Sequence, residues 1–209
     1  MNLIKGLIFD FDGTLADSLG VLLECVNHLA DDYNYPRIDN IDSIRSKPFK
    51  EFIRSHIRLN PLYLYLWRRE IRRLIRKRRH RIELFEGIEK LLLDLQNYGL
   101  FLYLLTSSPA EHCIPLLRRH GLDIFCGYYC GASMFNKARL INTLIKDSGI
   151  PKSQLCYIGD EIKDVESCVK ADIHMIGVSW GMNDPQSLLA AGAFQVVDTP
   201  DGIRKFVLR

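Results

Sequence analysis

The sequence has no hydrophobic run long enough to cross a bilayer. Its most apolar window, residues 91–106, is shorter than the roughly 20 apolar residues of a transmembrane helix and is interrupted by Asp94, Gln96, Asn97 and Gly99. The N-terminal residues also lack the cationic lead, apolar stretch and small-residue cleavage site that mark a secreted protein. We therefore expect a cytoplasmic protein.

Closely spaced cysteine pairs are also missing, although the chain has six cysteines. None forms a CxxC motif, and the nearest approach to one is Cys126-Gly-Tyr-Tyr-Cys130. A zinc site there would need further ligands that the sequence does not offer. Most of the cysteines are therefore expected to be small apolar core residues in a reducing compartment.

Acidic residues are nearly absent from one segment, residues 54–81, which we call the basic segment. It has eleven Arg or Lys and a single acid, Glu70, so its net charge is +10. The other 181 residues have 17 bases and 24 acids, a net charge of −7, and the chain total of +3 hides this contrast. Charge concentrated in this way can mark an anion-binding surface, which a mean charge cannot.

The composition itself, with 47% hydrophobic and 25% charged residues, is that of a chain that folds around a core. Apolar runs of strand length occupy residues 3–9, 100–105, 155–158, 174–179 and 194–197, with a weaker one at 128–131. Helical patterns between them occupy residues 88–98, 110–120, 137–148 and 164–171. This alternation predicts an α/β fold with a Rossmann-like parallel sheet that is covered by helices on both faces.

Residues 17–83 break the alternation, because they contain helical periodicity but no convincing strand. Apolar residues recur at helical spacing in two stretches, Leu19 to Leu29 and Trp67 to Ile75. We interpret residues 17–83 as an all-helical domain inserted after the first strand of an α/β core formed by residues 1–16 and 84–209. The basic segment lies inside this insertion.

The sequence Asp10-Phe-Asp12-Gly13-Thr14-Leu directly follows the first predicted strand. If the extended geometry continues, the carboxylates of Asp10 and Asp12 project to the same side. Gly13 permits a tight loop, and the backbone N–H groups around it, including that of Thr14, can hold an anion. Two adjacent carboxylates repel each other, so they need a cation or a shared proton. An isolated Asp-x-Asp would more simply be a solvated strand end.

A second acidic motif, Gly159-Asp160-Glu-Ile-Lys-Asp164, ends another predicted strand. Because ligand groups collect at the carboxyl ends of parallel strands, Asp160 can lie beside Asp10. Asp164, four residues after Asp160, would share its helical face, although such acids also simply complement a helix dipole. A cluster of carboxylate oxygens is the ligand set that Mg²⁺ prefers.

Thr106 and Lys137 supply groups that can bind a phosphate at the same edge of the sheet. Thr106 follows a predicted strand and can donate its hydroxyl, together with the Ser107 amide, to a phosphate oxygen; an ordinary turn before Pro109 would explain it equally. Lys137 begins a helical pattern and can bring a point charge, although a single lysine is usually solvated.

In this order and spacing, the motifs resemble those of the haloacid dehalogenase superfamily of phosphohydrolases, and especially its phosphoglycolate phosphatase-like branch. The resemblance extends over essentially the whole chain, and residues 17–83 match the helical cap of that branch in position. Asp17-Ser18 and Gly177-Val-Ser-Trp-Gly181 are also similar to it. The resemblance implies a Mg²⁺-dependent phosphatase that acts on a small phosphorylated metabolite, such as phosphoglycolate or a sugar phosphate.

The resemblance also implies a role for each motif residue. Asp10 would be the nucleophile that forms an aspartyl-phosphate, and Asp12 would protonate the leaving alkoxide and then take a proton from water. Mg²⁺ would be held by the carboxylates of Asp10 and Asp160 and by the backbone carbonyl of Asp12. Thr106 and Lys137 would bind oxygens of the transferring phosphoryl group.

Asp164 would support the site from outside the ligand set, for example by orienting Lys137. The acid at position 12 points to phosphoryl transfer, because the dehalogenases of the superfamily need no proton for their leaving group and lack an acid there. A phosphomutase of the same superfamily is the alternative that these residues leave open.

The cap is the part expected to choose the substrate. Within it, Arg45 and Lys47 lie in a loop that can dip toward the phosphoester and read an anionic group, although a solvated turn explains them equally. The basic segment has three interpretations: a cap helix with solvated arginines, a surface that steers an anionic substrate, or a docking surface for nucleic acid or an anionic membrane. The last would make this a binding protein with a haloacid dehalogenase-like fold.

Overall fold

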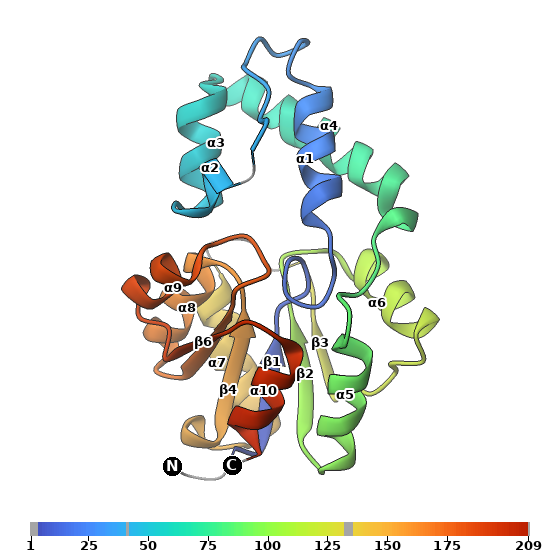
Figure 1. Ribbon diagram of the computed structural model, residues 1–209, viewed down its shortest axis with the longest axis vertical. Helices are drawn as coiled ribbons and strands as arrows, with labels where there is room; N and C mark the ends of the chain where they lie inside the picture. The colour runs from blue at the N-terminus through green and yellow to red at the C-terminus, as the bar shows by residue number, and fades with distance from the viewer. Residues whose placement is uncertain (1–3, 41, 132–135, 209) are drawn as a thin grey trace.

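The computed structural model describes residues 4–40, 42–131 and 136–208. Within these ranges, six strands form one sheet in the order β3-β2-β1-β4-β5-β6, and every neighbouring pair is parallel. The strands are β1 (Gly6–Phe9), β2 (Phe101–Leu105), β3 (Gly127–Tyr129), β4 (Leu155–Gly159), β5 (His174–Val178) and β6 (Gln195–Val197). The expected α/β fold with a parallel sheet is confirmed (Figure 1).

Helices precede and follow the strands along the chain. Between β1 and β2 they are α1 (Leu19–His28), α2 (Asp42–Arg45), α3 (Phe49–Ile57), α4 (Pro61–Arg78), η1 (Arg79–Arg81) and α5 (Ile88–Asn97). The later ones are α6 (Ala110–Arg119), α7 (Lys137–Ser148), η2 (Lys152–Gln154), α8 (Ile162–Ala171), α9 (Pro185–Ala191) and α10 (Pro200–Val207).

Each face of the sheet packs against its own set of helices, because alternate residues of a strand point to opposite faces. Leu7 and Phe9 of β1 belong to a buried cluster with apolar residues of α5, α6 and α10. Ile8, between them, belongs to a second cluster with residues of α7, α8 and α9. Burial on both faces explains why the strands are almost continuously apolar in sequence.

The helices α1–α4 lie between β1 and α5 in the chain and gather beyond the carboxyl ends of the strands (Figure 1). No strand occurs among the described residues of this insertion. Trp67, Ile71 and Leu74 form the buried face of α4, which packs mainly on α1. The Trp67 indole donates a hydrogen bond of 3.0 Å to the hydroxyl of Tyr35. These contacts give the cap helices a core of their own.

The two connections between the insertion and the sheet run side by side. Ala16 and Leu84 form an antiparallel bridge, and the Asp17 N–H donates to the Glu83 carbonyl at 2.9 Å. The pairing lies at the limits predicted for the two domains, 1–16 with 84–209 and 17–83. The domain limits themselves stay a prediction.

The sequence patterns do not predict α9 and α10, which are short helices near the C-terminal end. Each begins with a proline that follows a capping residue: Asp184 accepts a hydrogen bond from the Ser187 N–H, and Thr199 accepts one from the Gly202 N–H. Proline at the first helical position is a recognised start signal, but two turns are too short for a clear apolar period.

The described residues bear on two expectations, one about membrane-spanning helices and one about the cysteines. No helix in the described ranges combines the length and the apolar character that a membrane span requires. Of the six cysteines, Cys25, Cys113, Cys156 and Cys168 are buried, in agreement with a role as small core residues.

Candidate active site

The carboxyl ends of β1 and β4 place two acids side by side. Asp10 directly follows β1 and Asp160 directly follows β4, and the two strands pair with Phe9 opposite Ile158. Asp164 brings a third carboxylate from the first turn of α8. The three residues are buried, and one carboxylate oxygen of each lies within 4.8 Å of the others. The meeting of Asp10 and Asp160 expected from the sequence is confirmed.

This acidic cluster suits a divalent cation. Asp10 Oδ1 and Asp164 Oδ2 are buried and have no hydrogen-bond partner among the described residues. Burial raises the pKa of Asp160 and of Asp164, and the charge of Asp10 contributes to both increases. A cation held by these oxygens would offset the cost of burial and of repulsion, and hard divalent cations bind through carboxylate oxygens. The three residues could therefore hold a divalent metal.

The carboxylate of Asp12 is not part of this cluster. The strand ends at Phe9, so the two-residue alternation that would align Asp12 with Asp10 does not continue. The carboxylate of Asp12 instead accepts a hydrogen bond from the Ser108 hydroxyl. The expected backbone carbonyl contact of Asp12 with a metal stays a prediction, and Asp164 lies nearer to the candidate ligands than expected.

Burial raises the pKa of Asp12, although hydrogen bonds from Ser108 and Ser18 act in the opposite direction. A carboxyl group with a raised pKa retains its proton at higher pH than a solvated one. Such a group can protonate a leaving oxygen. The environment of Asp12 therefore suits the role of an acid, and the roles expected for Asp12 and Asp10 stay predictions.

The turn after Asp10 is fitted against Asp160. Gly13 has a φ of 74°, and a Cβ at this position would lie 2.1 Å from Asp160 Oδ2, so a side chain is excluded there. The Thr14 hydroxyl donates to Asp160 Oδ1 at 2.8 Å, and the Met182 N–H donates to Oδ2 at 2.8 Å. These contacts fix the orientation of the Asp160 carboxylate.

The backbone N–H groups of Gly13 and Thr14 are used inside the turn. They donate to the carbonyl oxygens of Ala16 at 2.9 Å and Phe11 at 3.3 Å. The phosphate-binding role expected for them stays a prediction, and in this structure the two groups close the turn.

Lys137 connects two of the carboxylates. It is the first residue of α7 and is buried. Its Nζ donates to Asp10 Oδ2 at 3.1 Å and to Asp164 Oδ1, and it lies 5.4 Å from the ring centre of Tyr157. Burial acts to lower the pKa of Lys137, but the charges of Asp10 and Asp164 outweigh it and raise the pKa well above its usual value. Lys137 is thus a fixed positive charge beside Asp10 rather than a solvated lysine.

Thr106 lies at the carboxyl end of β2, where the sequence places it. It is fully buried, its N–H donates to the Tyr129 carbonyl at 3.0 Å, and its hydroxyl oxygen accepts from the Ser108 N–H at 3.1 Å. The local turn considered as an alternative is therefore present, and the phosphate-binding role of Thr106 and of the Ser107 amide stays a prediction. Ser107 is exposed.

The cap loop that contains Arg45 and Lys47 is fastened to the core. The side-chain amide of Asn183 donates to the carbonyl oxygens of Arg45 at 2.7 Å and Lys47 at 2.9 Å, while Asn183 Oδ1 accepts from the Ile162 N–H at 2.9 Å. The Arg45 guanidinium donates to the Ser179 carbonyl. The loop does reach the core, but the part of Arg45 expected to read the substrate has a protein partner here, and its role in specificity stays a prediction.

Sequence reasoning did not single out Ser108 or Asn183. Ser108 follows the predicted strand end within a polar stretch before a proline, and that is the only local signal it gives. Asn183 lies just after the Gly177–Gly181 segment but contacts a loop more than 130 positions earlier in the chain. Neither contact can be read from the sequence near the residue.

Comparison with known proteins identifies one family of hydrolases, in which the relatives are phosphatases. The sequence profile of the family described as haloacid dehalogenase-like hydrolase matches residues 7–178. A phosphoglycolate phosphatase of Synechococcus elongatus is 31% identical over 98% of this chain and 97% of its own length. An N-acetylmuramic acid 6-phosphate phosphatase of Pseudomonas putida is 23% identical over 98% of this chain and 96% of its own.

A solved structure supports the fold. The crystal structure of a predicted phosphatase from Clostridium acetobutylicum superposes with a TM-score of 0.85 and 24% identity, and the match covers 99% of each chain. At this identity the likeness speaks for the architecture, including the helical insertion, and not for a substrate.

Proposed function

Since the chain belongs to the haloacid dehalogenase-like hydrolase family and is a phosphatase, we propose that it hydrolyses a small phosphomonoester through an aspartyl-phosphate on Asp10, with Mg²⁺ as the metal. The observation that carries this proposal is that buried Asp10 lies beside both the Lys137 ammonium group and the carboxylates of Asp160 and Asp164.

In the first step, a carboxylate oxygen of Asp10 attacks phosphorus. The new oxygen–phosphorus bond forms as the ester bond breaks, and Asp12 gives its proton to the leaving oxygen. The positive charge of Lys137, 3.1 Å from Asp10 Oδ2, is available to the phosphoryl oxygens, where negative charge is concentrated during transfer. Asp164 holds Lys137 in place from the other side.

In the second step, water attacks the phosphorus of the aspartyl-phosphate. Asp12, now a carboxylate, takes a proton from that water, and the bond between Asp10 and phosphorus breaks. Inorganic phosphate leaves, and both aspartates return to their starting states. The Ser108 hydroxyl, which donates to Asp12, favours the charged form that this step needs.

Asp10, Asp160 and the backbone carbonyl of Asp12 would hold Mg²⁺, with Asp164 close by. When bound, the ion would reduce the repulsion between these carboxylates and the phosphate dianion. The two buried carboxylate oxygens that lack hydrogen-bond partners support this assignment.

The substrate class proposed is a small phosphorylated metabolite of the phosphoglycolate or sugar phosphate kind. The support is the relative from Synechococcus elongatus, which is a phosphoglycolate phosphatase, and the fastening of a cap loop over the core. A phosphomutase would use the same nucleophile, and it is distinguished by moving phosphate within a sugar without releasing it.

The test is Mg²⁺-dependent hydrolysis of an aryl phosphate by the wild-type protein and by Asp10→Asn. We expect the wild type to release inorganic phosphate and Asp10→Asn to release none. Asp12→Asn should hydrolyse the substrate at a rate about 10²–10⁴-fold below that of the wild type. Asp17→Asn, an exposed acid outside the site, is the matched control and should keep its activity. A fully active Asp10→Asn protein would overturn the proposal.

A further inference from the structure

A hollow of about 260 Å³ lies next to Asp12, between the core and the cap. The core contributes Asp12, Ser108 and His112 to its lining, and the C-terminal end of the cap helix contributes Ile75, Arg79 and His80. The Arg79 guanidinium donates to the Glu111 carbonyl of α6 at 3.1 Å, so α4 and η1 end against the core at this point. The proposed acid that faces the leaving group therefore has cap residues beside it.

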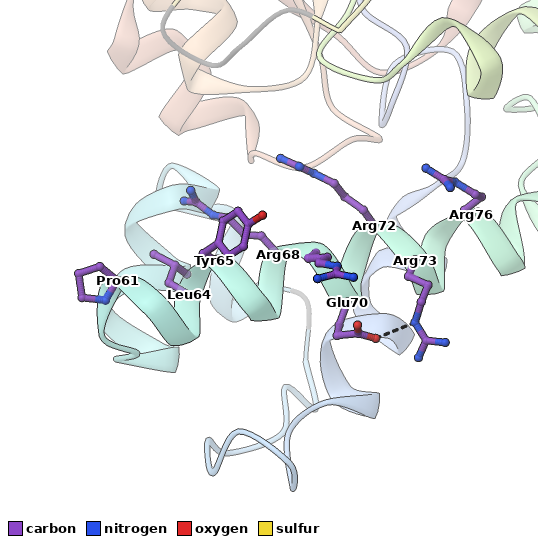
Figure 2. Close-up of a pocket in the computed structure, with 9 residues that line it drawn as sticks. Pro61, Leu64, Tyr65, Arg68, Glu70, Arg72, Arg73 and Arg76 are labelled. Atoms are coloured by element: carbon purple, nitrogen blue, oxygen red, sulfur yellow. Dashed lines mark hydrogen bonds and ion pairs between the residues drawn. The ribbon is translucent and has the colours of Figure 1, made fainter.

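Three arginines continue from this hollow along α4. Arg68, Arg72 and Arg76 are four residues apart, so they share one face of the helix with a rise of about 6 Å between neighbours. With Tyr65, Arg69 and the Glu70–Arg73 ion pair they line a larger hollow of about 660 Å³. Figure 2 shows Arg72 and Arg76 pointing to the side of α4 on which the core lies. We call Arg68, Arg72 and Arg76 the arginine row.

Ion pairs among the described residues do not explain the arginine row. Within the described ranges, none of its three guanidinium groups contacts a carboxylate, whereas Arg73, which lines the same hollow, pairs with Glu70 at 2.7 Å (Figure 2). Like charges four residues apart destabilise a helix, so the row is not a device that holds α4 together. Unpaired guanidinium groups at the edge of a substrate site are typical of phosphate recognition.

Charge also reaches the hollow beside Asp12. Burial lowers the pKa of His112, and the charges of Arg79 and Arg76 act in the same direction. Arg76 also lies three residues before Arg79, which lines this hollow, so the two side chains are neighbours on the helix surface. Arg76 is therefore the member of the row nearest to the hollow beside Asp12, and Arg72 and Arg68 follow at increasing distance along α4.

We propose that the arginine row binds a second phosphate on the leaving-group side of the substrate, so that the preferred substrates are small bisphosphorylated molecules. The inference rests on the proposed function, because it takes Asp12 as the acid that faces the leaving group. The size of the hollow between core and cap favours a small molecule over a polymer, since it is near the lower end of the volumes typical of small-molecule sites. Arginine forks bind phosphate in a bidentate way, and this gives the row its selectivity for that group.

The experiment compares the full-length wild type with Arg72→Gln/Arg76→Gln on fructose 6-phosphate, fructose 1,6-bisphosphate and an aryl phosphate, all with Mg²⁺. We expect the wild type to have a higher kcat/KM for the bisphosphate. The double variant should lose about 10–100-fold in kcat/KM for the bisphosphate, mainly through KM, and should hydrolyse the two monophosphates as the wild type does. Arg54→Gln/Lys77→Gln removes the same charge from two exposed cap positions that line neither hollow and should leave all three rates unchanged.

Three results would overturn the inference: equal losses on all substrates, no preference of the wild type for the bisphosphate, or equal losses in the two double variants. If the wild type hydrolyses the monophosphates without preferring the bisphosphate, the inference fails and the proposed function stands. If it hydrolyses none of them, both fail. Loss of heparin or oligonucleotide binding in Arg72→Gln/Arg76→Gln, with bisphosphate kinetics unchanged, would assign the row to a polyanionic partner instead.

Discussion

At the scale of single residues, the site separates two aspartates that are only two positions apart. Asp10 has the Lys137 ammonium group as its neighbour at 3.1 Å, whereas Asp12 has a hydroxyl donor, Ser108, and a pKa raised by burial. A cation beside one carboxylate and a neutral environment around the other favour a nucleophile and an acid, respectively. The different roles proposed for Asp10 and Asp12 would depend on neighbours that are distant in the sequence.

Ser108 offers a direct test of how the acid is tuned. The hydrogen bond from Ser108 favours the charged form of Asp12, so Ser108→Ala should raise the pKa of Asp12 further above its ordinary value. Asp12 would then stay protonated to higher pH, and the alkaline limb of the profile of kcat/KM against pH should move to higher pH. The measurement is hydrolysis of an aryl phosphate at constant ionic strength across the pH range.

Ser107→Ala is the matched control for this experiment, because it removes an exposed neighbouring hydroxyl and keeps the backbone N–H. It should leave the profile where it is. An alkaline limb that stays in place or moves to lower pH in Ser108→Ala would show that Ser108 does not tune Asp12.

At the scale of elements, the cap loop and the segment after β5 behave as one contact. Asn183 is fully buried and joins three elements, because its side chain bonds the loop after α2 and the first turn of α8. The Asp184 N–H adds a bond of 3.2 Å to the Arg45 carbonyl. The position of the cap loop is therefore coupled to the segment after β4, which contains Asp160 and Asp164.

Asn183→Asp should release this loop while it changes little in volume. Its Oδ1 can still accept from Ile162, but the two donors to Arg45 and Lys47 are replaced by an oxygen that faces two carbonyl oxygens. We expect the free energy of unfolding to fall by about 1–3 kcal/mol and trypsin to cleave more rapidly after Arg45, since Lys47 precedes a proline and resists cleavage.

The control for the loop is Ser187→Ala, which removes a longer bond of 3.4 Å to the Ser46 carbonyl of the loop and a bond of 2.8 Å to Asp184 Oδ2 outside it. Its rate of cleavage after Arg45 should stay close to that of the wild type. Unchanged cleavage in Asn183→Asp would mean that other contacts hold the loop.

Elements and motifs differ in how far the sequence predicts them. The sheet and most helices follow from apolar runs that the chain shows locally, and Asp10, Asp160 and Thr106 were placed correctly because each directly follows such a run. The environment of Asp12 was not predictable, since it depends on where β1 ends and on Ser108, 96 positions away. The same holds for Asn183, whose partners lie in the cap, and for α9 and α10, which are too short for a visible period.

At the scale of the whole molecule, two charge distributions face each other. The basic segment, with a net charge of +10, contains all of α4 and η1 and the end of α3. The buried acidic cluster lies at the carboxyl ends of the strands below the cap (Figure 1). Opposed fields of this kind attract an anion to the cap side and a cation to the sheet side. A phosphomonoester bound together with a divalent metal meets both demands at once.

The acidic cluster should make the stability of the whole chain depend on metal and on pH. Burial raises the pKa of Asp160 and of Asp164, so the metal-free folded state binds more protons than the unfolded state. Its stability must therefore fall as pH rises from the ordinary carboxyl range through the raised pKa values. A divalent cation removes that cost, and binding at 100 times the dissociation constant adds about 2.7 kcal/mol.

We therefore expect Mg²⁺ to raise the Tm of the wild type by roughly 5–10 °C at pH 8. The increase should be smaller at pH 6, where protons compete for the same oxygens. Asp160→Asn should abolish the increase, because it removes one carboxylate ligand, while Asp17→Asn should preserve it. Thermal unfolding of the three proteins with Mg²⁺ or with a chelator decides the matter. An equal increase in Asp160→Asn would place the metal elsewhere, and an increase that grows toward low pH would contradict binding by carboxylates.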